Sequence, residues 1–131
     1  ALRQGGSMSD QINKYFKWSE FACKCKRCEY SSGRDIDPRI PEVMLEIRLR
    51  LMRPITISSG CRCDFHNAMV GGSRNSQHKA AQGFKACDFL VTSAIERYMA
   101  VEICIKHGVS FGFTKGFMHI DVRGTPMAFT Y

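Results

Sequence analysis

The sequence has no long hydrophobic run. Its densest apolar stretch, from Ile40 to Met52, is interrupted by glutamate and arginine, whereas a membrane-spanning helix needs about 18 or more consecutive apolar residues. Internal repeats, low-complexity linkers and blocks of consecutive like charges are also missing. These absences exclude a transmembrane protein and a repeat array, and they leave a single folded unit.

The composition is that of an ordinary globular domain. Of the 131 residues, 44% are hydrophobic and 24% are charged, which is enough apolar material to bury a core at this length. Lys and Arg outnumber Asp and Glu by 19 to 12, and the net charge of +7 favours a polyanionic partner such as nucleic acid, an anionic membrane or an acidic cell wall. Because the basic residues are scattered and no aromatic-glycine signature accompanies them, no nucleic-acid partner is expected.

The start of the chain does not resemble a signal peptide. Residues 1–7 lack an apolar segment and precede Met8, so they are interpreted as the scar of a cleaved fusion tag. Residues 8–131 are then the expected domain. On this interpretation the natural protein is synthesised in the cytoplasm without a signal peptide.

The hydrophobic pattern predicts a small α+β domain. Two helices are indicated by apolar residues at helical spacing. The first has a proline at its first helical position, and the second has a capping pair of Ser93 with Glu96. Strands are indicated by β-branched or alternating segments between turn residues. We expect helices from Pro38 to before Pro54 and from Ser93 to Gly108, strands at Ile55–Ile57 and Ala86–Val91, a surface loop over 67–83, and a hairpin of Val109–Phe113 with Phe117–Arg123.

The last predicted strand has two different faces. Strand alternation places Met118, Ile120 and Val122 on one face. The other face carries His119, Asp121 and Arg123. Such a strand can anchor itself in the core and present an imidazole beside a carboxylate. An ordinary half-solvated strand is the alternative interpretation.

Seven cysteines leave at least one unpaired. They are Cys23, Cys25, Cys28, Cys61, Cys63, Cys87 and Cys104. Three interpretations are open: reduced or core thiols, a disulfide that links the two clusters, or a second, structural zinc ion held by four thiolates. The zinc interpretation is less favoured than reduced thiols because C-x-C is a less usual chelating spacing than C-x2-C.

Three segments together contain the ligand types of a hydrolytic zinc centre. They are Ser76-Gln77-His78, Gly83–Asp88 and His119–Arg123. Such a centre takes three nitrogen or oxygen ligands from the protein and leaves one position for water. His78, Asp88 and His119 match that count, and because they are remote in sequence the site would form only in the folded chain.

These segments resemble the zinc D-Ala-D-Ala carboxypeptidase family, whose relatives include D-Ala-D-Ala dipeptidases, phage L-alanyl-D-glutamate endolysins and, in fold and ligand set, the Hedgehog signalling domain. The family pattern is S-x-H, then G-x-A-x-D, then a late histidine strand. Segments 18–23, 57–63 and 70–78 also match, so the resemblance runs in order over about residues 16–124. It implies an antiparallel sheet that carries a zinc cleft, one catalytic Zn²⁺ bound by His78, Asp88 and His119, and Arg62 at the substrate carbonyl or the developing oxyanion. A surface arginine in a turn is the alternative interpretation of Arg62.

The chain departs from the family pattern at two places. The interval from His78 to Asp88 is enlarged, which is tolerable because the free-energy cost of closing a loop grows slowly with its length. The acid or histidine that several relatives carry shortly before the last ligand is also missing, since Gly116 and Phe117 stand there. Asp121 is therefore the provisional general base, with hydrogen bonding to a ligand as its alternative role.

Ser76 has two possible roles as well. It either contacts the substrate or orients a ligand, or it is a turn-forming hydroxyl. The other two histidines, His66 and His107, are not expected to be metal ligands. A loop or helix-start role is expected for the first and a helix C-terminal role for the second.

The resulting hypothesis is a monomeric zinc metallopeptidase that hydrolyses an amide bond in peptidoglycan stem peptides, as a D-Ala-D-Ala carboxypeptidase or an endolysin-type endopeptidase. It would act on the bacterial cell wall, and a phage lysis or virion-associated enzyme is one origin. Two alternatives stay open. One is a catalytically inactive zinc-containing binding module of the same fold, and the other is a cysteine-clustered nucleic-acid module.

Overall fold

The computed structural model describes residues 9–130, so the expected tag scar at residues 1–7 lies outside the described residues. The elements in chain order are η2 (Trp18–Phe21), α1 (Arg39–Leu51), β1 (Ile57–Ser59), α2 (Asp64–Met69), η3 (Ala80–Gln82), β2 (Ala86–Leu90), α3 (Ala94–His107), β3 (Ser110–Phe113), β4 (Phe117–Asp121) and β5 (Ala128–Thr130). Within residues 9–130, no helix is both long enough and apolar enough to cross a bilayer.

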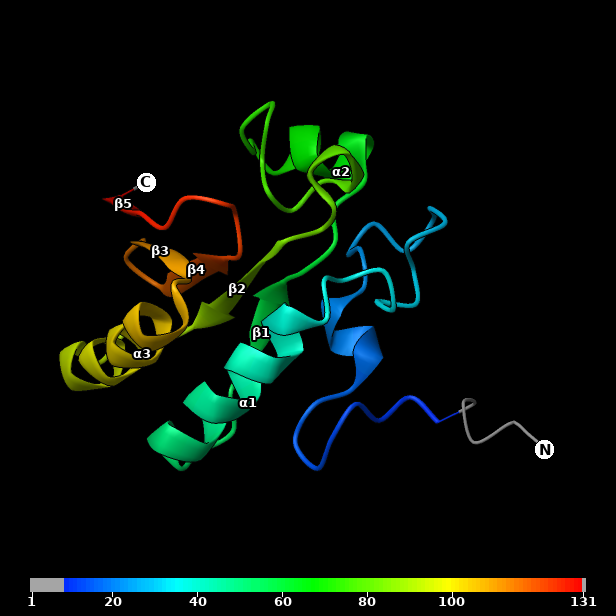
Figure 1. Ribbon diagram of the computed structural model, residues 1–131. Coiled ribbons are helices and arrows are strands. Elements are labelled where there is room, and N and C mark those ends of the chain that lie inside the picture. The colour runs from blue at the N-terminus through cyan, green and yellow to red at the C-terminus, as the bar shows by residue number, and fades with distance from the viewer. Residues whose placement is uncertain (1–8, 131) are drawn as a thin grey trace.

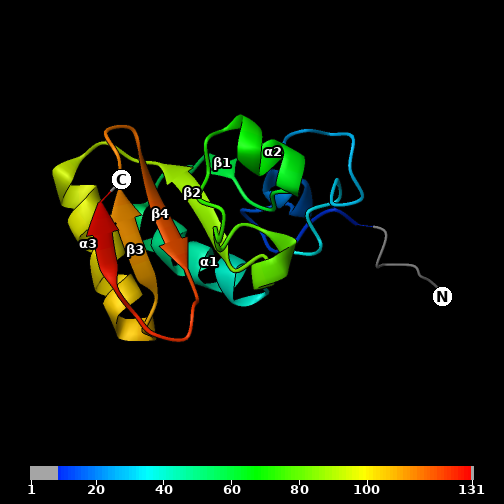
Figure 2. The same ribbon diagram turned by 90° about the horizontal axis from the view of Figure 1, so that it is seen from above.

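The strands form one sheet in the order β1-β2-β4-β3-β5. Neighbouring strands are antiparallel except β3 and β5, which are parallel. Helices α1 and α3 lie side by side on one face of the sheet, and α2 lies on the other side (Figures 1 and 2). The predicted α+β class is confirmed, and the sheet is antiparallel as expected except at the β5 edge.

The main core lies between the sheet and the two long helices. Strands β2 and β4 bury alternate side chains toward α1 and α3, as the period of two requires. The fully buried apolar side chains of these elements include Ile40, Met44, Ile47, Cys87, Phe89, Ala100, Cys104, Met118 and Ile120. The opposite face of β2 and β4 carries Asp88, His119 and Asp121, which are also buried.

Local signals define the ends of the two long helices. Asp37 accepts a hydrogen bond from the Arg39 amide at 3.0 Å before α1, and Ser93 accepts one from the Glu96 amide at 3.3 Å at the start of α3. Both contacts satisfy backbone donors that have no partner inside the helix. Both helices therefore agree with the sequence-based prediction to within one or two residues.

Two predictions about local structure were wrong in detail. Strand pairing at β1 begins at Ile57, because this residue is the first to pair with Phe89, rather than at Ile55. Helix α2, with its N-terminus capped by Cys63, enters the region predicted as a loop, and it is too short to show a hydrophobic period.

The first prediction tests the helix-sheet core. Ile47→Ala removes a side chain that is 0% exposed on α1, so the free energy of unfolding should fall by about 2–5 kcal/mol. Leu49→Ala, on the same helix at 53% exposure, should change it by less than about 0.5 kcal/mol. Urea unfolding followed by circular dichroism measures both, and equal effects would contradict this packing.

Candidate metal centre

Strand register brings the first two polar side chains together. Asp88 of β2 and His119 of β4 are directly opposite each other in the antiparallel ladder. Facing residues on adjacent antiparallel strands point to the same side of the sheet. Asp88 Oδ1 and His119 Nδ1 are consequently 2.9 Å apart, with both residues buried.

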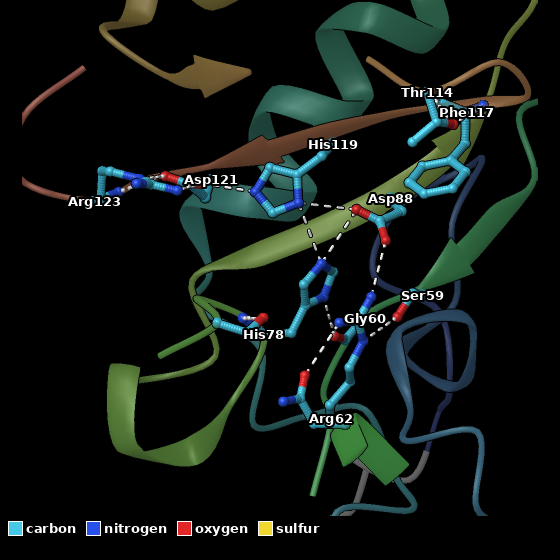
Figure 3. Close-up of polar contacts among 12 residues, drawn as sticks. Ser59, Gly60, Arg62, His78, Asp88, Thr114, Phe117, His119, Asp121 and Arg123 are labelled. Carbon is cyan, nitrogen blue, oxygen red and sulfur yellow. Dashed lines mark hydrogen bonds and ion pairs between the residues drawn. The ribbon is translucent and has the colours of Figure 1, made fainter. Parts of the chain in front are cut away.

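His78 reaches the same point from the segment before β2. The Arg62 amide donates to the His78 carbonyl at 2.9 Å and thereby fixes this segment beside β1. His78 Nε2 then lies 3.1 Å from Asp88 Oδ1 and 3.3 Å from His119 Nδ1. Figure 3 shows the two rings and the carboxylate meeting at one place.

The enlarged interval between His78 and Asp88 forms a compact turn. Within it, η3 forms a tight turn in which the Gly83 amide donates to the Ala80 carbonyl at 2.9 Å and the Phe84 amide donates to the Lys79 carbonyl at 3.1 Å. Both ends of the interval stay anchored. The insertion therefore leaves the two side chains within contact of each other.

The hydrogen bonds behind the two imidazoles define their tautomers. His78 Nδ1 is 2.8 Å from the Gly60 carbonyl, and His119 Nε2 is 2.7 Å from Asp121 Oδ2. A carbonyl and a carboxylate can only accept, so each of these ring nitrogens carries the proton. In a neutral imidazole the other nitrogen is a bare acceptor, and those are the two nitrogens that face Asp88 Oδ1.

Three acceptor atoms therefore converge with no proton between them unless an imidazole becomes charged. Such an arrangement is repulsive by itself and is relieved by a cation at its centre. Ligand distances of about 2.0–2.1 Å in a tetrahedral zinc site place neighbouring N and O ligand atoms about 3.3 Å apart. The observed separations of 2.9, 3.1 and 3.3 Å are close to that spacing, so His78, Asp88 and His119 fit a divalent metal ion.

Burial and charge act in opposite directions on these groups. Burial lowers the pKa of His78. Burial acts against the charged form of His119 too, but the bonds to Asp121 and Asp88 outweigh it and raise the His119 pKa. Asp88 is desolvated, yet His119 and His78, which donate to it and attract it when protonated, bring its pKa well below the ordinary value. The carboxylate therefore stays ionised at neutral pH, as a metal ligand must.

Asp121 lies behind His119 and away from the convergence point. Its side chain is 0% exposed, and Arg123 donates to both of its oxygens, at 2.7 Å to Oδ1 and 2.6 Å to Oδ2. A buried carboxylate whose oxygens are occupied in this way is poorly placed to take a proton from water. This geometry favours the alternative role of Asp121, in which it orients a ligand through a hydrogen bond.

Arg62 lies beside the three converging atoms. Its guanidinium donates to Ser59 Oγ at 3.0 Å, to Asn67 Oδ1 at 3.2 Å and to Asp88 Oδ2 at 3.1 Å. The side chain keeps 11% exposure. The backbone of Gly72 packs closely against this guanidinium, because a Cβ on Gly72 would be 2.8 Å from Arg62 Nη1. Arg62 thus holds the outer oxygen of Asp88 and turns Oδ1 toward the histidines.

The structure places Ser76 in a turn. Its hydroxyl accepts a hydrogen bond from the His78 amide at 3.2 Å, which fits the turn-forming role. His66 lies on α2 and His107 pairs with Glu46 at the end of α3. Neither belongs to the converging set.

Two contributors were not identified from the sequence. The first is the Gly60 backbone carbonyl, held so close to Phe21 that a Cβ on Gly60 would lie 2.4 Å from the Phe21 oxygen. The second is Asn67, a buried amide that binds Arg62 and also donates to the Ser73 carbonyl at 2.9 Å. The available signal was a glycine within segment 57–63 and an asparagine shortly after it, but neither residue type by itself indicates a role at a site.

Comparison with known proteins gives one match. A family model described as Peptidase M15 matches residues 14–121. This range contains β1, β2, β4 and all three residues of the converging set. No curated protein and no solved structure matches the chain.

The tautomer arrangement leads to a second prediction. In metal-free protein, the raised pKa of His119 means that its proton contributes stability that is complete below the unfolded value of about 6.5 and is lost as the pH rises through the folded pKa. Asp121→Asn removes the largest raising contribution, so the His119 pKa should fall. NMR titration of the imidazole nitrogens measures it.

Asp35→Asn provides the matched control, because Asp35 is an exposed carboxylate and its replacement should leave the His119 titration unchanged. An identical His119 pKa in the wild type and in Asp121→Asn would contradict the bond between these two side chains.

Proposed function

The chain belongs to the Peptidase M15 family, and from this premise we propose that it is a zinc-dependent peptidase that cleaves an amide bond in peptidoglycan stem peptides. The observation that carries the proposal is the convergence of two imidazole nitrogens and one carboxylate oxygen. In this proposal His78, Asp88 and His119 hold one catalytic ion. When bound, zinc supplies Lewis acidity, which polarises a carbonyl and makes water a nucleophile at neutral pH.

Arg62 is proposed to bind the substrate carbonyl. Its guanidinium is fixed by three acceptors and lies next to Asp88, so its charge is already oriented before a substrate arrives. A fixed positive charge at the carbonyl oxygen stabilises the negative charge that develops there during attack. Partial exposure of the side chain leaves a face of the guanidinium for the substrate.

Asp121 and Arg123 are proposed as positioning residues. Asp121 holds the proton on His119 Nε2 and keeps Nδ1 free, while Arg123 keeps Asp121 ionised through two hydrogen bonds. Ser76 also helps to position His78, because its hydroxyl accepts a hydrogen bond from the His78 amide. These contacts orient the ligands and do not touch the reacting atoms.

The charge of the chain supports a cell-wall substrate. The net charge of +7 attracts a negatively charged wall polymer, and stem peptides end in carboxylates that cationic side chains can bind. The family resemblance carried by residues 57–63 and 70–78 supports the same substrate class. We propose the bacterial cell wall as the place of action.

One observation favours a second candidate, a zinc-containing binding module without catalysis. Gly116 and Phe117 stand where several relatives carry an acid or a histidine, and Asp121 is turned away from the convergence point. Binding of a stem peptide without hydrolysis would need no general base. Product analysis separates the two candidates.

A third prediction tests hydrolysis. Purified peptidoglycan treated with the protein should release new stem-peptide fragments, identified by liquid chromatography with mass spectrometry. A chelator should abolish the release, zinc should restore it, and His119→Ala should be inactive because one donor is lost. His107→Ala, a histidine outside the converging set, is the control and should remain active.

Absence of metal-dependent release from several wall chemotypes, together with retained binding of stem peptides, would favour the binding module instead. The masses of the fragments identify the bond that is cut, since D-Ala-D-Ala and L-Ala-D-Glu cleavage leave different products.

A fourth prediction concerns Arg62. Arg62→Lys keeps the charge but loses the planar fork that contacts three acceptors at once. We expect kcat to fall about 10²–10³-fold with bound metal unchanged, because the three donors remain. Arg74→Lys, in an exposed loop position, should leave kcat unaffected. Equal kcat for Arg62→Lys and wild type would remove Arg62 from the mechanism.

A further inference from the structure

Four cysteine thiols converge at a second place. Cys23, Cys25 and Cys28 come from the segment after η2, and Cys63 comes from the position before α2. Their Sγ atoms all lie within 4.8 Å of one another. From this convergence we propose a structural zinc site in which the four cysteines are the only ligands and no position is left for water or substrate.

The sulfur separations match tetrahedral coordination. A zinc-sulfur distance of about 2.3 Å in a tetrahedron places neighbouring sulfurs about 3.8 Å apart. Cys25 Sγ lies 3.6 Å from Cys23 Sγ and 3.8 Å from Cys63 Sγ. One sulfur therefore contacts two others at the expected edge length, a pattern that a single disulfide between two of them would not require.

Backbone amides point at all four sulfurs. The Arg27 amide donates to Cys25 and the Tyr30 amide to Cys28, both at 3.4 Å. These contacts join residues two apart in the chain. They are hydrogen bonds that favour the thiolate form, which is the form that binds metal.

Of the other two amide contacts, one joins the two segments and one lies within the second segment. The Cys63 amide donates to Cys23 Sγ at 3.4 Å, across 40 positions of sequence, and the His66 amide donates to Cys63 Sγ at 3.3 Å. The sulfurs are thus held by the backbone of both segments. A metal ion would add bonds to an arrangement that the fold already organises.

Nearby cations offset the charge of such a site. Four thiolates and one Zn²⁺ carry a net charge of −2, and Lys24, Lys26 and Arg27 alternate with the cysteines in the sequence and are exposed. Lys26 takes a left-handed conformation with φ 60°, which turns the chain between Cys25 and Cys28. The positive charge of this loop would stabilise a negatively charged tetrathiolate, whereas four neutral thiols would gain nothing from it.

The remaining cysteines have a different environment. Cys61, Cys87 and Cys104 are buried among apolar side chains of the core and do not belong to the cluster. All seven lie within residues 9–130, where none forms a disulfide. The two C-x-C pairs therefore differ: Cys23 and Cys25 both belong to the cluster, whereas Cys61 is buried in the core and only Cys63 joins the other three.

The site would connect the N-terminal segment to the neighbourhood of the candidate catalytic centre. Cys63 follows Arg62 directly and caps α2, so an ion bound there fixes the start of the helix that also carries Asn67. The ion would act by restraining the chain, because four protein ligands leave no open position. The proposal does not depend on the proposed peptidase activity.

Metal analysis of the full chain, purified in the presence of zinc, tests the proposal as a fifth prediction. We expect two zinc ions per chain in the wild type, one in His119→Ala, one in Cys28→Ala and one in Cys25→Ala. Cys61→Ala removes a thiol two residues from Cys63 but outside the cluster, and it should keep two. A zinc content that is the same in Cys28→Ala, Cys25→Ala and wild type would overturn the site, as would iron in place of zinc.

Two further measurements apply even if a cysteine variant fails to fold. Cobalt replacing zinc in His119→Ala should give a strong thiolate-to-metal charge-transfer band, which nitrogen and oxygen ligands cannot produce. Trypsin should cut at Lys24, Lys26 or Arg27 many-fold faster after chelation than with zinc bound. A missing charge-transfer band and unchanged cleavage would overturn the proposal, whereas loss of peptidase activity alone would not affect it.

Discussion

The arrangement around the candidate metal centre depends on one electrostatic constraint: three acceptor atoms meet, and the protons that could separate them are directed elsewhere. The Gly60 carbonyl holds the proton of His78 on Nδ1, and Asp121 holds that of His119 on Nε2. Acceptors at 2.9–3.3 Å repel one another unless a cation lies between them or an imidazole is protonated. Packing of the fold holds the three atoms together against this repulsion, and a bound cation would remove the repulsion.

The sheet provides the rigidity that such a centre needs. Asp88 and His119 face each other across β2 and β4, and the alternate residues of the same strands are buried against α1 and α3. A one-residue slip in register would turn both polar side chains into the apolar core and the apolar ones out of it. The hydrophobic core therefore also determines where the side chains of Asp88 and His119 lie. His78 is the exception, since its position depends on backbone contacts of a loop.

Sequence reasoning identified what periodicity and residue chemistry encode. Alternation placed His119 and Asp121 on one face of their strand, and caps located both long helices. It could not reveal that the Gly60 carbonyl orients His78, because a backbone acceptor carries no residue-type signal. It left two roles open for Asp121, general base or hydrogen-bond partner of a ligand, because only the three-dimensional structure shows that Arg123 donates to its carboxylate. Helix α2 was missed because six residues are too few for a hydrophobic period.

The charges of the residues around the candidate metal centre balance one another. Each carboxylate near the centre has its own arginine: Arg62 contacts the outer oxygen of Asp88, and Arg123 contacts Asp121. The two pairs sum to zero, and the neutral imidazoles add nothing. A divalent ion held there would keep nearly its full charge for a substrate carbonyl, since charges at a metal site act together with that of the ion. Binding by unpaired carboxylates would be tighter but would leave a weaker Lewis acid. In the proposed peptidase, the paired arginines would thus favour polarisation of a substrate over affinity for the ion, which is the balance that hydrolysis needs.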